Sequence, residues 1–360
     1  LWGPDGQYVQ PDGGVSEGPH YHGFALSPSI AFFVALDNAV ADRVFSRSCL
    51  NRQDVDPWAG HGCVEGEDFT FENPLYDPTF HATAEWSATL RLPMGWRPPF
   101  EDAYFVTVNG GALLPHWGAP EWLGWDWATM EDGTWPSLER SADLSLHHLA
   151  YLDAGVIDAG PPEFRSAFLP AAGNAVFRTG WGRDDLWVLL IAEHGSVRKT
   201  LHDHVDSTSF TLAAYGEYLL LDPGYYKPVD FDNARTSSPD AHNVVLVDGR
   251  GAPDKGLLIA FGDTDAYLEN PVNTTVLEYA EAWQSYEGAD IERSVAMVRE
   301  RYLVVADRIA SATSDARSFT WRLNGNAGHD AGGTFTVRPD GADWVRETAG
   351  VAVHLASTAP

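Results

Sequence analysis

The sequence predicts an α+β chain in which a helical half is followed by an antiparallel β-sandwich. Before residue 165, the apolar residues of the longest segments repeat at helical spacing. After it, short runs of β-forming residues are separated by turn residues, with no helical segment between them. We therefore expect a helical domain over residues 1–165 and a β-sandwich over 166–360, joined by the linker DAGPPEF.

The helical half is predicted to contain three helices, over residues 25–46, 80–91 and 137–153. The first has Ser27 as a capping residue and Pro28 in its first turn, a favourable pair at a helix start. The segments 47–80 and 93–136 are rich in Gly, Pro and aromatic residues, so we expect them to be long loops.

The second half contains apolar runs of strand length. They are Leu186–Ala192, Phe210–Leu221, Val244–Val247, Leu257–Phe261, Val276–Trp283, Tyr302–Ala306 and Phe319–Leu323. The chain opens in a loop-like stretch and closes in a strand-like one, so we expect the helical domain to lack its N-terminal part and the sandwich to be trimmed at its C-terminus.

The charge balance excludes some partners. The formal net charge is -28, which repels nucleic acid and anionic membranes. No run of 18 apolar residues is present, so we expect no membrane insertion. An anionic substrate would need a local basic pocket within this negative field. Cys49 and Cys63 could form one disulfide, but a single pair does not define the compartment.

Three features of the second half suggest a metal site. They are His202-x-His204, Asp222 at the end of the run LLLD, and His242 before the next apolar run. In a strand, His202 and His204 would share one face. Two imidazoles and one carboxylate form a common zinc set. Each residue also has an ordinary interpretation: Asp222 precedes Pro-Gly and is typical of a turn, and a lone histidine is usually structural.

The HxH pattern also suggests a cupin-like metal oxygenase or isomerase. A cupin needs an acid four or five residues after the second histidine, where this chain has Thr208 and Ser209. The Pro-x-Gly expected before the last histidine is also missing from SSPDAHN. The cupin alternative is therefore weak.

The order LPAAGNAVFRTGW, HDHVDSTSFTLAAYGEYLLLDPGYY, ARTSSPDAHNVVLVDGR resembles the heparinase II/III-like polysaccharide lyases, and PDGGVSEGPHYHGFAL is similar to a segment of their helical domain. The resemblance implies the C-terminal part of an incomplete α/α toroid followed by an antiparallel β-sandwich. It also implies cleavage of a uronic-acid-containing glycan by β-elimination. A base removes the C5 proton, an acid protonates the departing O4, and the product has a 4,5-unsaturated uronate end.

The resemblance assigns roles to individual residues. Tyr21 matches the catalytic tyrosine, which acts as acid and for some substrates as base, and His202 matches the catalytic histidine. His204, Asp222 and His242 match the ligands of a zinc ion that braces the site.

Substrate binding is expected to involve Arg235, His20, His22 and Glu17, with at most one of the two histidines facing the cleft. The family also uses an Asn or His upstream of the tyrosine, and none of the residues before Tyr21 matches it. We expect that residue upstream of Leu1.

The expected partner is an anionic polysaccharide or oligosaccharide, and the acidic surface favours an unsulfated polymer such as alginate over a heavily sulfated one. The resemblance implies a periplasmic or secreted bacterial enzyme and leaves room for a homodimer. The alternative within the same fold is a carbohydrate-binding homologue without lyase activity.

Overall fold

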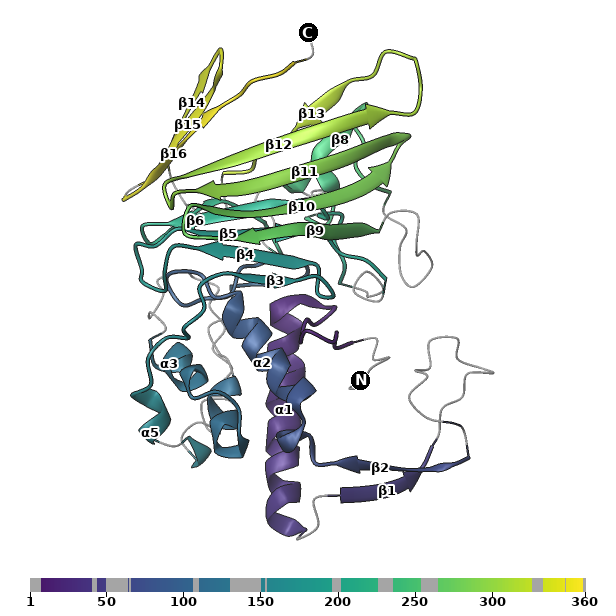
Figure 1. The fold of residues 1–360 in the computed structure, drawn as a ribbon, viewed down its shortest axis with the longest axis vertical. Helices are drawn as coiled ribbons and strands as arrows, with labels where there is room; N and C mark the ends of the chain where they lie inside the picture. The colour runs from purple at the N-terminus through teal and green to yellow at the C-terminus, as the bar shows by residue number, and fades with distance from the viewer. Residues whose placement is uncertain are drawn as a thin grey trace.

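The computed structural model describes residues 8–40, 44–49, 64, 66–105, 110–129, 150–152, 154–195, 202–225, 236–253, 265–325, 333–346 and 348–358. Helices precede the main sheets along the chain, and the described strands pair antiparallel. The predicted α+β fold class is therefore confirmed. Figure 1 shows the sheets formed after residue 166 stacked above the helices.

The first half contains helices and one hairpin. The helices are α1 (Gly18–Ala39), α2 (Pro78–Thr89), α3 (Trp122–Ala128) and α5 (Ala154–Ile157), with 3-10 turns η1 (Pro74–Tyr76) and η2 (Gly110–Trp117). The hairpin pairs β1 (Val44–Ser48) with β2 (Asp68–Glu72). The second predicted helix is present as α2. The third lies outside the described residues except for 150–152.

Helix α1 differs from its prediction at both ends. It begins at Gly18, so Pro28 lies inside it and Pro19 takes the place of the first-turn proline. Pro19 lacks an N–H at a position where no helical acceptor exists, so it costs nothing there. Pro28 removes one internal hydrogen bond, and the hydroxyl of Ser29 donates to the carbonyl of Ala25 at 2.7 Å nearby. From Val44 onward the chain forms β1 rather than the end of a helix.

The two segments predicted as loops are only partly irregular. The first contains the end of β1, all of β2 and η1, and its buried Cys49 is disulfide-bonded. Its predicted partner Cys63 lies outside the described residues. The second segment contains η2 and α3, whose Leu113 and Leu123 are buried with α1 and α2. The composition of these segments predicted loops because Gly, Pro and Trp interrupt the regular spacing of apolar residues.

The second half is a two-layer sandwich with smaller sheets beside it. A five-stranded sheet has the order β3-β4-β5-β6-β7, and a four-stranded sheet has the order β12-β11-β10-β9. The strands are β3 (Ala167–Leu169), β4 (Asn174–Arg178), β5 (Trp187–Ile191), β6 (Phe210–Ala214), β7 (Glu217–Leu220), β9 (Ala266–Asn273), β10 (Leu277–Tyr286), β11 (Ala289–Val298) and β12 (Tyr302–Ser311). Side chains such as Val188, Phe210 and Val295 fill the space between the layers.

The remaining strands extend the second half. Strand β8 (Val245–Val247) pairs with β13 (Phe319–Trp321), and β14 (Thr334–Arg338), β15 (Gly341–Val345) and β16 (Gly350–His354) form a separate sheet. The predicted run Phe210–Leu221 is two strands, because Tyr215 and Gly216 adopt positive φ angles and turn the chain. The run Leu257–Phe261 lies outside the described residues.

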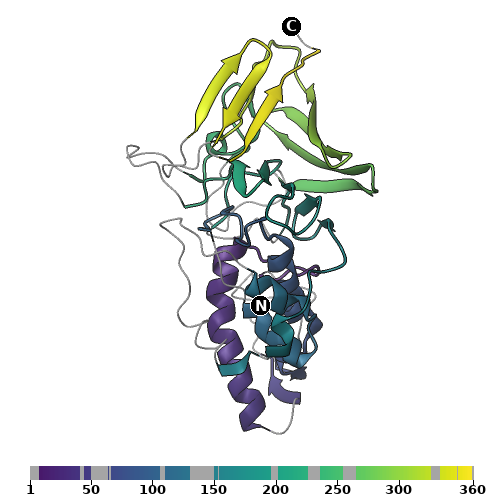
Figure 2. The same cartoon turned by 90° about the vertical axis from the view of Figure 1, so that its left-hand side faces the viewer.

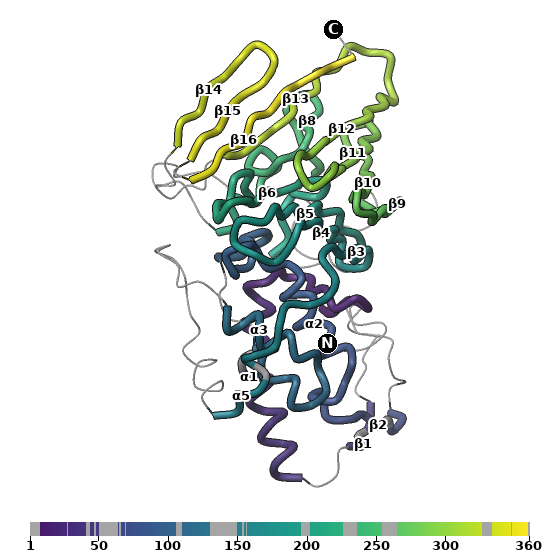
Figure 3. The backbone as a smooth tube through the Cα atoms, turned by 60° about the vertical axis from the view of Figure 1, so that its left-hand side comes forward, coloured from purple at the N-terminus to yellow at the C-terminus, as the bar shows by residue number. Residues whose placement is uncertain are grey.

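The helical half packs on the five-stranded sheet. Trp86 of α2 is buried with Trp187 and Tyr218 of the sheet, and its indole N–H donates to Asn174 Oδ1 at 2.8 Å. Figures 2 and 3 show the helices gathered below this sheet, on the side away from β9–β12. The start of α1 and the end of α2 therefore lie next to this sheet (Figure 1). Among the described residues, no helix combines the length and apolarity needed to cross a membrane.

Candidate active site

One irregular segment, residues 98–105, contacts both halves of the molecule and organises the candidate site. A Cβ on Gly18 would lie 3.0 Å from Cβ of Glu101, and one on Gly224 would lie 2.2 Å from the Ala103 carbonyl oxygen. Only glycine allows these two close approaches, and both glycines have positive φ angles. The start of α1 and the Asp-Pro-Gly turn are thus held against the same short segment.

Tyr21 and His202 lie in ring-to-ring contact at this junction. Tyr21 is in the first turns of α1, and His202 follows β5 by a long connection. Their ring centroids are 3.7 Å apart, and the planes differ by 21°. The Tyr8 hydroxyl donates to the Tyr21 carbonyl at 3.1 Å. A phenol and an imidazole from distant parts of the chain are therefore brought side by side.

Asp102 holds both histidines of the HxH motif. One carboxylate oxygen is 2.8 Å from His202 Nδ1, and the other is 3.0 Å from His204 Nε2. Burial acts to raise the pKa of Asp102, but hydrogen bonds from His204 and His202 outweigh it and lower that pKa. The ionised carboxylate accepts the Nδ1–H of His202, which leaves the basic lone pair of the ring on Nε2.

The HxH segment is not a strand, which corrects the prediction that His202 and His204 share a strand face. Residues 202–209 precede β6 as turns, and Thr208 has a φ of 73°. A strand pattern was expected because the flanking residues are β-formers. Because the segment turns instead, the two rings reach Asp102 through different nitrogens, Nδ1 of His202 and Nε2 of His204. His204 is 1% exposed, whereas the His202 side chain is 19% exposed.

A buried cluster of His204, Asp222 and His242 lies behind His202. One potential ligand atom from each residue lies within 4.8 Å of the others. His242 Nδ1 is 2.8 Å from Asp222 Oδ2, whereas His242 Nε2 and His204 Nδ1 are buried with no hydrogen-bond partner in the described structure. Two orphaned imidazole nitrogens beside a buried carboxylate have the donor types and burial of a metal site.

The hydroxyl of Tyr21 has a second aromatic neighbour. It lies 2.7 Å from the hydroxyl of Tyr225, which follows the Asp-Pro-Gly turn. His20 contacts the edges of the Tyr21, Tyr104 and Tyr225 rings at centroid distances of 5.2, 5.5 and 6.2 Å. His20 is therefore part of the aromatic wall around Tyr21.

The other predicted substrate-binding residues lie in different surroundings. His22 is in the core, edge-on to Trp86, and burial followed by the charge of Arg97 lowers its pKa to about 3. This burial leaves no route to a substrate, which argues against the predicted role. Glu17 is half-buried at the start of α1, where burial raises its pKa and the nearby His202 opposes that rise. Arg235 lies outside the described residues.

Sequence reasoning missed the acidic pair Glu101 and Asp102. Glu101 accepts a hydrogen bond from the His204 backbone N–H at 2.7 Å, and it forms a buried carboxylate cluster with Glu193 and Asp206. Burial and then the charges of Asp206 and Glu193 raise its pKa. The available signal was two adjacent acids in the otherwise apolar stretch PPFEDAYF. It was hidden because no local pattern shows which residues such a segment will contact.

Comparison with known proteins places the chain in a family. The family model described as "Heparinase II/III-like, C-terminal" matches residues 161–360, more than half of the chain. The chain therefore belongs to the heparinase II/III-like family, and the predicted resemblance is confirmed. This membership also sets aside the cupin alternative. No curated protein sequence matches the chain.

Solved structures agree on the fold. A crystal structure of heparinase III superimposes with a TM-score of 0.60 at 15% identity, covering 94% of this chain and 47% of that one. The crystal structure of the heparan sulfate lyase HepC from Pedobacter heparinus superimposes with a TM-score of 0.59 at 17% sequence identity. The match covers 94% of this chain and 46% of that one. The chain thus spans less than half the length of these structures.

Proposed function

We propose that this chain carries acid and base residues of a polysaccharide lyase that cleaves uronic-acid-containing glycans by β-elimination. The observation that carries the proposal is the stacking of Tyr21 on His202, with His202 oriented by Asp102. Family membership supports the lyase class. Because the chain spans less than half of the related structures, the activity is stated as a proposal for the natural protein.

His202 is proposed as the base. Its Nδ1 is paired with Asp102, so Nε2 would take the C5 proton and Asp102 would stabilise the imidazolium that forms. Tyr21 is proposed as the acid. The C4–O4 bond breaks as the Tyr21 hydroxyl proton passes to O4, and the electrons of the C5–H bond form the C4–C5 double bond. Both groups emerge from one stacked pair, so they would act on the same face of the sugar.

The neighbouring carboxylate of the substrate must be neutralised as negative charge develops next to C5. We propose Arg235, which lies outside the described residues, for this task. His20 and Glu17 border the acid–base pair and are proposed to contact the sugar. The expected compartment is the periplasm or the exterior of a bacterial cell, where such polymers occur.

The cluster of His204, Asp222 and His242 is proposed to bind zinc in a structural role. The orphaned nitrogens of the two histidines and the buried carboxylate suit the preference of zinc for nitrogen and oxygen donors. When bound, the ion would neutralise Asp222 and fix the two histidine rings. Asp102 would then be the outer carboxylate that orients His204, an arrangement common around protein zinc sites.

The test is an incubation of the full-length protein with alginate, heparan sulfate, hyaluronan, chondroitin and ulvan. Formation of unsaturated uronate is followed by its ultraviolet absorbance. Cleavage of at least one polymer is expected, with alginate favoured over the sulfated chains by the acidic surface. Absence of product from all five, with polymer binding retained, would instead support the non-catalytic carbohydrate-binding alternative.

A further inference from the structure

The position of Tyr225 is fixed by the backbone around it. Its N–H donates to the Ala103 carbonyl at 2.9 Å, directly after Gly224 has brought the turn against the same carbonyl. The Tyr225 ring lies 5.0 Å from that of Tyr104, centroid to centroid. Its hydroxyl is therefore held by main-chain and ring contacts that a phenylalanine at this position would keep.

The Tyr225 hydroxyl connects two groups of the proposed mechanism. It is 2.7 Å from the Tyr21 hydroxyl, and it also forms a hydrogen bond with the Asp102 carboxylate. Because Asp102 is a pure acceptor when ionised, Tyr225 donates to it and can accept from Tyr21. Burial, the hydrogen bond with Tyr21 and the charge of Asp102 raise the pKa of Tyr225, so this residue keeps its proton.

We propose that Tyr225 is a positioning residue for Tyr21: it holds the Tyr21 hydroxyl in the resting site and donates to the Tyr21 oxygen as that oxygen loses its proton. This inference rests on the proposed function. Rotation about the Tyr225 C–O bond is enough to move its proton from Asp102 to Tyr21, since both oxygens lie within hydrogen-bond reach. A donor aimed at a developing oxyanion lowers the barrier of the step that creates it.

Tyr225→Phe tests the role of the hydroxyl while keeping the ring. Loss of a hydrogen bond to a charged oxygen is expected to lower kcat by about 10- to 100-fold. KM should change less than about twofold, because the contact is proposed to strengthen only in the transition state. The matched control is Tyr76→Phe, which removes another half-buried tyrosine hydroxyl, one that donates to Asp37 at 2.9 Å in the helical half.

A second measurement is independent of activity. In protein labelled at the hydroxyl-bearing ring carbon of tyrosine, the NMR resonance of Tyr21, assigned with Tyr21→Phe, should shift in Tyr225→Phe and stay in place in Tyr76→Phe. His20, His202 and Asp102 also surround the pair and are unchanged in both variants.

The outcomes separate the two proposals. An unshifted Tyr21 resonance overturns the inference whatever the protein cleaves. Equal kcat values for the two variants, or a loss confined to KM, overturn it as well. If the Tyr21 resonance shifts but the protein cleaves none of the five polymers, the hydrogen bond between Tyr225 and Tyr21 is supported. Only the proposed function is then rejected.

Discussion

The rings of Tyr21 and His202 stack face to face, although 180 residues of sequence separate them. Removing the Tyr21 hydroxyl should therefore leave the ring stacking intact while it removes the proposed acid and its hydrogen bond with Tyr225. For Tyr21→Phe we expect kcat to fall by a factor of about 10² to 10⁴. The rate of unsaturated product formation measures this, and an unchanged melting temperature shows that the fold is retained. Full activity in this variant would exclude Tyr21 as the acid.

Asp102 should affect catalysis and metal binding together, because its two oxygens contact different histidines. Asp102→Asn keeps the size of the side chain but loses its charge. We expect kcat to fall, and the affinity for zinc to weaken by about 10- to 100-fold. Chelator competition measures the affinity. Asp37→Asn, which changes a carboxylate bonded to Tyr76 and Trp117, is the control and should alter neither quantity.

Removal of zinc should lower stability, because the ion would bind the folded chain and not the unfolded one. At a zinc concentration about 1,000 times Kd, the stabilisation is about 4 kcal/mol. A chelator should lower the melting temperature of the wild type and have no effect on His242→Ala. His81→Gln alters a buried histidine whose ring contacts the Leu75 carbonyl, so it should keep its zinc. Elemental analysis that finds no zinc in the purified wild type would contradict the metal assignment.

Substitution of Arg293 should lower the stability of the fold rather than remove a group that acts in the proposed reaction. It is fully buried, pairs with Asp307 at 2.8 Å and donates to the carbonyls of Thr208 and Asn243, the second of which follows His242 in the chain. Arg293→Met leaves Asp307 and both carbonyls without this partner. We expect the free energy of unfolding to fall by about 3–5 kcal/mol. Urea denaturation measures it, and adding Asp307→Leu should recover part of the loss.

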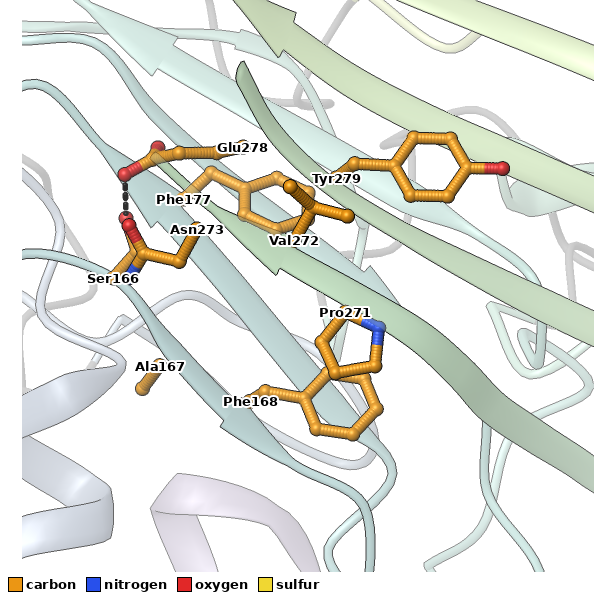
Figure 4. Close-up of a pocket in the computed structure, with 9 residues that line it drawn as sticks. All are labelled: Ser166, Ala167, Phe168, Phe177, Pro271, Val272, Asn273, Glu278 and Tyr279. Carbon is orange, nitrogen blue, oxygen red and sulfur yellow. Dashed lines mark hydrogen bonds between the residues drawn. The ribbon is translucent and has the colours of Figure 1, made fainter. Parts of the chain in front are cut away.

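Glu278 should give stability a pH dependence. It lines a shallow pocket between β3–β4 and β9–β10, where its carboxylate accepts from the Ser166 hydroxyl at 2.6 Å (Figure 4). Burial raises its pKa above the ordinary value of 4.5. The folded state thus favours the protonated form, and the contribution of Glu278 to stability, complete below pH 4.5, is lost as the pH rises through the raised pKa.

Glu278→Gln should therefore be more stable than the wild type at neutral pH and no more stable at pH 4. Denaturation at the two pH values tests this. Glu292→Gln, which alters a more exposed carboxylate on the same sheet, should show a much smaller difference. A wild type more stable than Glu278→Gln at neutral pH would contradict the sign of the shift.

The sequence predicted elements whose pattern is local. The run around Trp187 is continuously apolar, the run around Leu277 contains Val, Leu, Tyr and Trp between its glutamates and alanines, and the structure contains strands at both places. Helix α1 was misplaced because Pro28 was interpreted as a helix start, whereas an earlier proline takes that role. Strand β11 was missed because its charged residues, such as Asp290 and Glu292, alternate with buried ones and interrupt the apolar run.

The residues of the candidate site also fall into two groups, those that a sequence pattern can select and those that it cannot. The motif residues Tyr21, His202, His204, Asp222 and His242 could be selected from the sequence because each belongs to a recognisable pattern. Asp102 and Tyr225 could not, because their importance comes from contacts across 100 and 204 residues of sequence. The burial of His22 one position after Tyr21 follows from the helix, which turns adjacent side chains to different sides.

Asp102 and Tyr21 come from the helical half, whereas His202, His204 and Tyr225 come from the second half. Neither half alone holds both the proposed acid and the proposed base. A newly made chain whose two halves have each folded but have not yet docked would thus be latent. Under the proposed function, glycan cleavage would begin only when the two halves have docked, so an activity assay would also measure correct assembly.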